Sequence, residues 1–313
     1  MENLFSIVGQ LAALFAIVAV GYLAKKTKYM TTEFDALFSR LILNVAIPGL
    51  VIGSVLTADK LPSREDILMA FFISCASYVL MFIIAYLVVF LLRIPHGSRG
   101  VYRFMLCFGN VGFIGFPVLS TIFGQSALVY ATIFNLPFNL LVFTVGAWFL
   151  TRDTCSKSDP PVNWRTFVTP AIISCIVAIV LALLNVHSVP LVGDAFALLG
   201  SLTTPGALLV IGSSLANVPV RRLAGTPRLW AMAVIRVALI PLAVWGVFHF
   251  FITDPLMLGA IMVISGMPVA SNGTMLCFQY GGDSFTMAQG TFITTVLSLV
   301  SIPLLVAFYY LVV

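Results

Sequence analysis

Long apolar runs alternate with short polar segments along the whole chain. Each run is about 20 residues long, which is the length of a helix that crosses a bilayer, whereas strands of a membrane barrel alternate over about 10 residues. The pattern therefore predicts an all-α integral membrane protein. We expect ten transmembrane helices with these bounds: Leu4–Ala24, Phe34–Leu56, Ile67–Leu92, Gly100–Phe123, Ala127–Leu150, Trp164–Leu184, Leu191–Ala216, Leu229–Ile252, Leu256–Tyr280 and Phe285–Val312.

The composition supports a membrane protein. Hydrophobic residues make up 61% of the chain and charged residues 9%, and the mean hydropathy is +1.11. So few polar residues cannot cover the surface of a soluble protein. The basic residues lie in short loops between the apolar runs, so the pI of about 9.0 does not indicate a nucleic-acid partner.

Basic residues are concentrated in alternate loops. The loops after the first, third, fifth and seventh runs hold twelve lysines and arginines, and the even loops hold two, Lys60 and Arg64. Basic residues favour the cytoplasmic side, so we expect both termini outside the inner (plasma) membrane of the cell. Glu2 precedes the first run and Lys25 follows it, the reverse of a cleaved signal peptide.

Glycine and proline interrupt two of the runs near their middles. The first interruption reads Gly109-Asn110-Val111-Gly112-Phe113-Ile114-Gly115-Phe116-Pro117, and the second reads Ser265-Gly266-Met267-Pro268-Val269-Ala270-Ser271-Asn272-Gly273. A helix must break at each of them. Two broken helices, one in each half of the chain, are typical of a transporter built from inverted repeats.

Weak internal similarity supports such a repeat. Val51-Ile52-Gly53-Ser54 recurs as Val210-Ile211-Gly212-Ser213 about half a chain later. We predict a first five-helix repeat over residues 1–150, a cytoplasmic connector over residues 151–163 and a second repeat over residues 164–313. Five is an odd number, so the second copy lies inverted in the membrane.

The two interruptions carry most of the residues that we expect to bind a ligand. Proline suits the first turn of a helix, so Pro117 and Pro268 are expected to begin second half-helices whose free N–H groups attract an anion. The candidate ligand contacts here are Asn110, Gly112, Phe113, Gly115, Pro117, Pro268, Ser271 and Asn272. The alternative is that glycine and proline only permit close helix packing and a kink.

Polar residues on other spans are further candidates for the same cavity. Asn135 and Asn139 are four residues apart, so they share one face of a helix. Asn44 and Thr204 either line the cavity or bond a carbonyl of their own helix. Arg236 lies well within a span and is either a counter-ion for a carboxylate substrate or a side chain that extends to the cytoplasmic interface.

The sequence carries no motif of catalysis or metal binding. Acidic residues lie near the predicted ends of the spans, which disfavours a proton-coupled exchanger built on a buried carboxylate pair. The five cysteines occur singly, and phosphate-loop and hydrolase motifs are missing. We expect no enzyme activity, no resident metal and no cofactor, while sodium bound by carbonyls, hydroxyls and amides at the breaks stays open.

Three motifs resemble the auxin efflux carrier family, which includes bacterial malonate-type permeases and the plant PIN exporters. They are Asn44-Val45-Ala46-Ile47-Pro48, the stretch Gly109 to Pro117, and Met267-Pro268-Val269-Ala270-Ser271-Asn272. The resemblance covers essentially the whole chain. It implies an inverted-repeat fold similar to bile-acid symporters and NhaA, in which spans 3 to 5 and 8 to 10 move against a scaffold of spans 1, 2, 6 and 7.

The resemblance also implies roles for single residues. Asn110 matches the substrate-contacting asparagine of the family, and Pro117 and Pro268 match its crossover prolines. Bacterial members often carry a second asparagine where this chain has Phe113. That departure indicates a different or more apolar substrate.

We expect a secondary transporter of a small organic anion, an auxin- or malonate-like mono- or dicarboxylate, that works by alternating access of the elevator type. The membrane potential would drive export. The alternatives are a sodium- or proton-coupled importer of organic acids and, from another class, a non-transporting membrane sensor. The expected partners are the anion and the lipid bilayer; a homodimer stays open, and nucleic acid is not expected.

Overall fold

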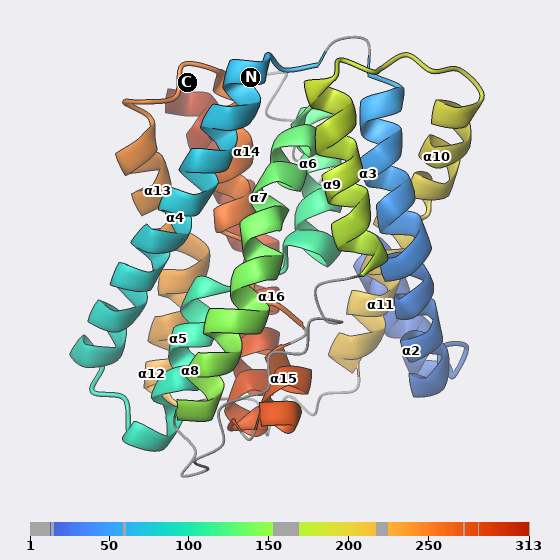
Figure 1. Cartoon of the computed structure of the whole chain (residues 1–313). Helices are drawn as coiled ribbons and strands as arrows, with labels where there is room; N and C mark the ends of the chain where they lie inside the picture. Colours follow the sequence, from blue (N-terminus) through green and yellow to red (C-terminus); the bar gives the residue numbers. More distant parts are fainter. Residues whose placement is uncertain are drawn as a thin grey trace. The chain divides into compact units, whose positions relative to one another are not determined.

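The chain folds into helices. The computed structural model describes residue 13 and residues 16–58, 61–152, 169–216, 225–271, 273–280 and 282–312. Within these ranges the regular structure is helical (Figure 1). The exception is one isolated bridge, between Gly109 and Val269. The prediction of an all-helical protein is therefore confirmed for the described residues.

The helices follow the predicted apolar runs, and several of them contain a short π-helical turn. The α-helices are α2 (Thr32–Leu41), α3 (Ile47–Leu56), α4 (Arg64–Leu91), α5 (Arg99–Cys107), α6 (Phe116–Phe123), α7 (Ala127–Leu141), α8 (Ala147–Arg152), α9 (Pro170–Leu183), α10 (Val192–Ser201), α11 (Thr203–Ala216), α12 (Pro227–Val234), α13 (Ile240–Phe248), α14 (Pro255–Ser265), α15 (Gly273–Tyr280) and α16 (Ser284–Val312). The π-helical turns are Ile42–Ala46, Val111–Gly115, Val142–Gly146 and Ile235–Leu239, and a 3-10 turn covers His96–Ser98.

Several helical segments can cross a membrane by themselves. Among the described residues, six are long and apolar enough: Thr32–Leu56, Arg64–Leu91, Ala127–Thr151, Val192–Ser213, Pro227–Phe248 and Ser284–Val312. The chain is therefore a multi-pass membrane protein. The count of ten spans and the inverted repeat stay predictions, because the first run and the connector lie partly outside the described residues.

Proline explains three of the π-helical turns. Each of these turns ends two residues before Pro48, Pro117 or Pro241. Proline cannot donate to the carbonyl four residues earlier, and its ring crowds that carbonyl, so the helix widens there. Five candidate residues lie in these turns: Asn44, Gly112, Phe113, Gly115 and Arg236.

The chain divides into two compact units, and each unit combines segments from both halves of the sequence. The first unit contains Met1–Phe71, Val111–Leu136 and Val168–Pro219, and the second contains Phe72–Asn110, Pro137–Phe167 and Val220–Val313. The first unit gathers the spans expected to form the scaffold, together with residues 111–136, which the resemblance assigns to the moving part. The two five-helix repeats describe a symmetry of the chain and stay a prediction.

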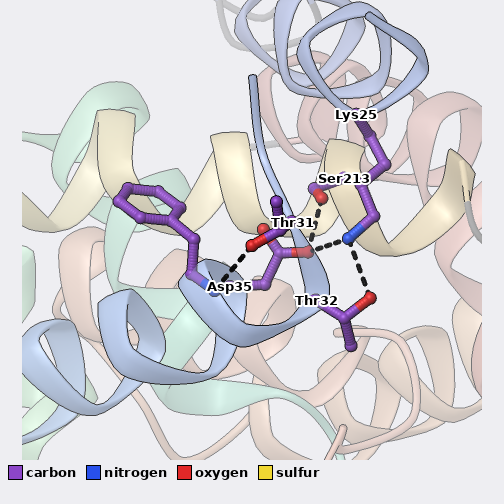
Figure 2. Close-up of polar contacts among 6 residues, drawn as sticks. Lys25, Thr31, Thr32, Asp35 and Ser213 are labelled. Carbon is purple, nitrogen blue, oxygen red and sulfur yellow. Dashed lines mark hydrogen bonds and ion pairs between the residues drawn. The ribbon is translucent and has the colours of Figure 1, made fainter. Parts of the chain in front are cut away.

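A buried ion pair joins three helical segments of the first unit. Lys25, near the end of the helix over residues 16–26, places its Nζ 2.6 Å from Oδ2 of Asp35 in the first turn of α2. Ser213 on α11 donates to the same oxygen at 2.7 Å, and Lys25 also donates to Thr32 Oγ1 at 3.2 Å (Figure 2). The Lys25 and Asp35 side chains are only 10% and 11% exposed.

Gly212 allows α11 to lie against the first helix in the same unit. A Cβ atom on residue 212 would lie 2.0 Å from the carbonyl oxygen of Val18. No side chain fits at that distance, so the close approach requires glycine. It also keeps the neighbouring Ser213 near the start of α2.

An aromatic cluster fills the interior of the second unit around Phe108. The centroid of the Phe108 ring lies 5.0 Å from that of Phe104, 6.2 Å from those of Phe82 and Phe138, and 6.3 Å from that of Tyr78. Each such ring pair contributes about 0.5–1.5 kcal/mol beyond the burial of its area. Because α5 ends one residue before Phe108, the cluster holds the end of α5 in place.

Candidate functional site

Both predicted breaks are present. Helix α5 ends at Cys107 and helical structure resumes at Val111, so the first link is residues 108–110. Helix α14 ends at Ser265 and α15 begins at Gly273, so the second link is residues 266–272, of which Asn272 lies outside the described residues. Both links belong to the second unit. We call their described residues, 108–110 and 266–271, the crossing.

The two links of the crossing pair with each other. The Asn110 N–H donates to the Pro268 carbonyl oxygen at 2.7 Å, and the Ala270 N–H donates to the Phe108 carbonyl oxygen at 3.0 Å. These bonds satisfy backbone groups that have no helical partner. An unpaired backbone group is costly inside a membrane, so the pairing stabilises two breaks that would each be unfavourable alone.

Arg236 connects the crossing to the ends of both preceding helices. Its Nη1 donates to the Leu106 carbonyl oxygen, in the last turn of α5, at 3.0 Å. Its Nε donates at 3.1 Å to the carbonyl oxygen of Met267, two residues after the end of α14. The residue is 1% exposed. The alternative in which this side chain extends to the membrane interface is therefore wrong.

Gly109 makes room for the guanidinium group. It lies in the middle of the bridge between the links, opposite Val269. A Cβ atom on residue 109 would lie 2.1 Å from Nη2 of Arg236 and 3.1 Å from the carbonyl oxygen of Met267. Any side chain at this position would therefore have to displace the guanidinium.

The charge of the guanidinium matches the helix ends that it contacts. The C-terminal end of a helix carries about −0.5 elementary charge, so two such ends carry about −1. Arginine keeps its positive charge in proteins. Among the described residues, no carboxylate lies within ion-pair distance of Arg236. The ion pair that these residues do form joins Lys25 and Asp35, in the first unit. Arg236 therefore neutralises helix ends instead of an acidic side chain.

Thr294 on α16 supplies another partner to the crossing. Its Oγ1 accepts a hydrogen bond from the Val269 N–H at 3.1 Å and donates one to the Gly290 carbonyl oxygen at 2.8 Å. The side chain is fully buried. Sequence reasoning missed this residue, and its only local signal is the group of threonines at positions 291, 294 and 295 in an apolar run.

A family comparison covers nearly the whole chain. The sequence model described as "Membrane transport protein" matches residues 6–161 and 155–306. The chain belongs to this family. It is the auxin efflux carrier family, which the three motifs resemble, and membership indicates transport rather than catalysis.

Relatives within the family are named as transporters. An "Uncharacterized transporter" of Methanothermobacter thermautotrophicus is 24% identical over 294 residues, which cover 93% of this chain and 95% of the relative. A "Putative malonate transporter" of Rhizobium meliloti is 23% identical over 313 residues, which cover 95% of this chain and 93% of the relative. An uncharacterized transporter of Methanocaldococcus jannaschii is 24% identical over 300 residues, which cover 92% and 94%.

In this family member, three of the predicted residues make hydrogen bonds at the crossing: Asn110, Pro268 and Arg236. Pro268 lies inside the link and offers its carbonyl oxygen to Asn110, so the expectation that it begins the second half-helix is wrong. That helix begins at Gly273. Pro117 does lie in the first turn of α6, but a π-helical turn precedes it instead of an unwound link.

Three more candidates belong to the second unit: Ser271, Asn139 and Asn272. Ser271 is the last described residue of its link and is exposed. Asn139 is half-buried on α7. Asn272 lies outside the described residues. Their contact with substrate stays a prediction.

The remaining candidates belong to the first unit. Asn135 is buried on α7 and donates from Nδ2 to Cys175 Sγ at 3.5 Å. Thr204 is half-buried on α11, and Asn44 is exposed in its π-helical turn. The turn before α6 contains Gly112, Phe113 and Gly115. Their role in binding also stays a prediction.

Proposed function

We propose that this chain is a secondary transporter that moves a small organic anion, a mono- or dicarboxylate, by alternating access. Membership of the membrane transport family supports transport. The name of the Rhizobium relative supports a malonate-like carboxylate as substrate. Export driven by the membrane potential is the direction that we propose.

The contacts of Arg236 carry this proposal. Arg236 neutralises the negative ends of α5 and α14, whereas the helices that follow begin at Val111 and Gly273 with about +0.5 elementary charge each. Residues 104–123 and 255–280 contain no aspartate or glutamate. The helix starts therefore keep their positive charge, and such starts bind anions.

The side chains next to these helix starts are suited to a carboxylate ligand. Asn110 immediately precedes Val111, and Ser271 and Asn272 immediately precede Gly273. We assign these three as hydrogen-bond donors to the carboxylate. Phe113 lies two residues after Val111 in the chain, and we propose that it favours a substrate with an apolar part.

The membrane potential supplies enough energy for this transport. Moving one elementary charge across 100 mV is worth about 2.3 kcal/mol. A negative cell interior therefore favours exit of a monoanion by this amount, and exit of a dianion by twice as much. Such a uniporter needs no buried acidic residue to couple transport to protons.

Efflux from liposomes tests the proposal. Purified protein is reconstituted into liposomes loaded with labelled malonate, and a potassium gradient with valinomycin sets the potential. We expect faster efflux when the lumen is negative. Replacing Asn110→Ala should slow efflux at least tenfold, because a hydrogen bond to a charged group is worth about 1.5–3 kcal/mol. Gln125→Ala, an exposed amide in the turn before α7, is the matched control.

Each alternative gives a different result in this assay. Uptake that requires sodium or a proton gradient would support a coupled importer. Binding of carboxylates without flux would support a membrane sensor. An efflux rate that does not depend on the imposed potential would contradict the uniport mechanism. An unchanged rate in Asn110→Ala would show that Asn110 does not bind the substrate.

A further inference from the structure

We infer that Arg236 is a built-in cation that occupies the position of a coupling sodium ion at the crossing. This inference rests on the proposed anion transport. It adds that Arg236 balances the charge of the helix ends at the same site, and that the transport cycle does not use a sodium ion. It identifies Arg236 as a positioning residue for the crossing.

A sodium ion at broken helices needs free oxygen atoms. In transporters of this architecture, unwound carbonyl groups and half-helix C-terminal ends coordinate the coupling ion. Here the carbonyl oxygens of Leu106 and Met267 accept hydrogen bonds from Arg236. Those of Phe108 and Pro268 accept backbone N–H groups from the opposite link. The protein's own donors therefore already engage these four carbonyl oxygens at the two helix ends and links.

The side chains near the crossing also offer few oxygen ligands to a sodium ion. The hydroxyl of Thr294 accepts from one backbone N–H group and donates to one carbonyl oxygen. No aspartate or glutamate occurs in the segments of the second unit that contain the crossing or its partners, which are residues 72–91, 99–110, 227–248, 255–280 and 284–312. A sodium ion would find no carboxylate there to offset the loss of its hydration shell.

The shape of the guanidinium suits this role. Its planar fork presents donors in fixed directions, so one side chain reaches two helix ends at once. Burial among Met81, Gly109 and the two carbonyl groups holds it in place. Because the charge is attached to the chain, the crossing keeps its balance of charge in every step of the transport cycle.

Salt substitution and two variants of residue 236 test this inference. Thermal unfolding of the purified protein is measured without substrate in sodium chloride and in N-methyl-D-glucamine chloride at equal ionic strength. We expect the same midpoint in both salts. Arg236→Met should lower the midpoint by several degrees and slow malonate efflux about tenfold, since it removes two hydrogen bonds from a charged donor. Arg236→Lys keeps the charge and should retain more of both properties.

Several results would overturn the inference. A ligand that binds the folded state raises its stability, so a higher midpoint of the unmodified protein in sodium would show a bound ion. Equal effects of the lysine and methionine variants, or none from either, would show that the charge is irrelevant. If Arg236→Met does not fold, the salt comparison and Arg236→Lys still decide. The unfolding measurements need no substrate, so a failure of malonate to move would contradict only the proposed function.

Discussion

At the scale of single residues, the identity of residue 109 depends on that of residue 236. The guanidinium of Arg236 lies against the backbone of Gly109, at a distance that leaves no room for a Cβ atom. In the sequence, Gly109 is one of three glycines in the first interruption. The structure explains the glycine at this position, because its lack of a side chain lets the buried guanidinium of Arg236 reach two helix ends.

Replacing Gly109→Ala should therefore displace Arg236. The new methyl group would lie 2.1 Å from Nη2, and such overpacking typically costs about 1–3 kcal/mol. We expect a lower midpoint of thermal unfolding and a loss of malonate efflux similar to that of Arg236→Met. Gly97→Ala is the matched control, because no atom lies within 4 Å of the added Cβ. Equal behaviour of the two alanine variants would contradict the contact.

At the scale of helices, the polar contacts of the first unit link segments that are far apart in sequence. Asp35 accepts from Lys25, ten residues earlier, and from Ser213, 178 residues later. Its second oxygen, Oδ1, is buried and has no hydrogen-bond partner among the described residues. The carboxylate therefore depends on Lys25 for the balance of its charge.

Removing Lys25 should destabilise the protein more than removing the whole ion pair. Lys25→Met leaves the Asp35 carboxylate buried without its counter-charge, which costs about 3–5 kcal/mol for a buried pair. The double variant Lys25→Met with Asp35→Asn replaces the charge by an amide and should recover part of this loss. Unfolding midpoints of both purified variants at neutral pH measure the difference. A double variant that is no more stable than Lys25→Met would show that the ion pair does not stabilise the contact between these helical segments.

At the scale of the whole molecule, the compact units do not follow the halves of the sequence. The first unit takes Val111–Leu136 from the later part of the first half, and the second takes Phe72–Asn110 and Pro137–Phe167 from either side of it. The boundary at Asn110 and Val111 coincides with the first break. A chain that changes units at a broken helix is consistent with the moving parts that alternating access needs.

The charges of the loops predict the orientation of the chain in the membrane, and this prediction can be tested. In a cysteine-free background, single cysteines replace Lys60 and Lys157. A membrane-impermeant maleimide applied to intact cells should label the cysteine at position 60 and should leave that at position 157 unlabelled, because basic loops favour the cytoplasm. Permeabilised cells, in which both positions should react, are the control. Labelling of position 157 alone would place both termini inside.

Local features of the fold could be predicted from the sequence, whereas partners across the fold could not. The apolar runs predicted the helical class, and the glycines and prolines near Asn110 and Pro268 predicted both breaks. The position of Pro268 within its break was wrong, because its place depends on pairing with the other link. Arg236 was predicted to face either a substrate or the interface, and the structure pairs it with carbonyl groups.

The sequence by itself determined where helices form, where two of them break and where prolines widen them, because these outcomes depend on residues a few positions apart. Only the tertiary structure decided what completes each break. Leu106 lies 130 positions from Arg236, and their hydrogen bond exists only because packing brings α5 beside the helix that carries the arginine. Backbone carbonyl groups are present at every residue, so no sequence pattern distinguishes the ones that a buried guanidinium will contact.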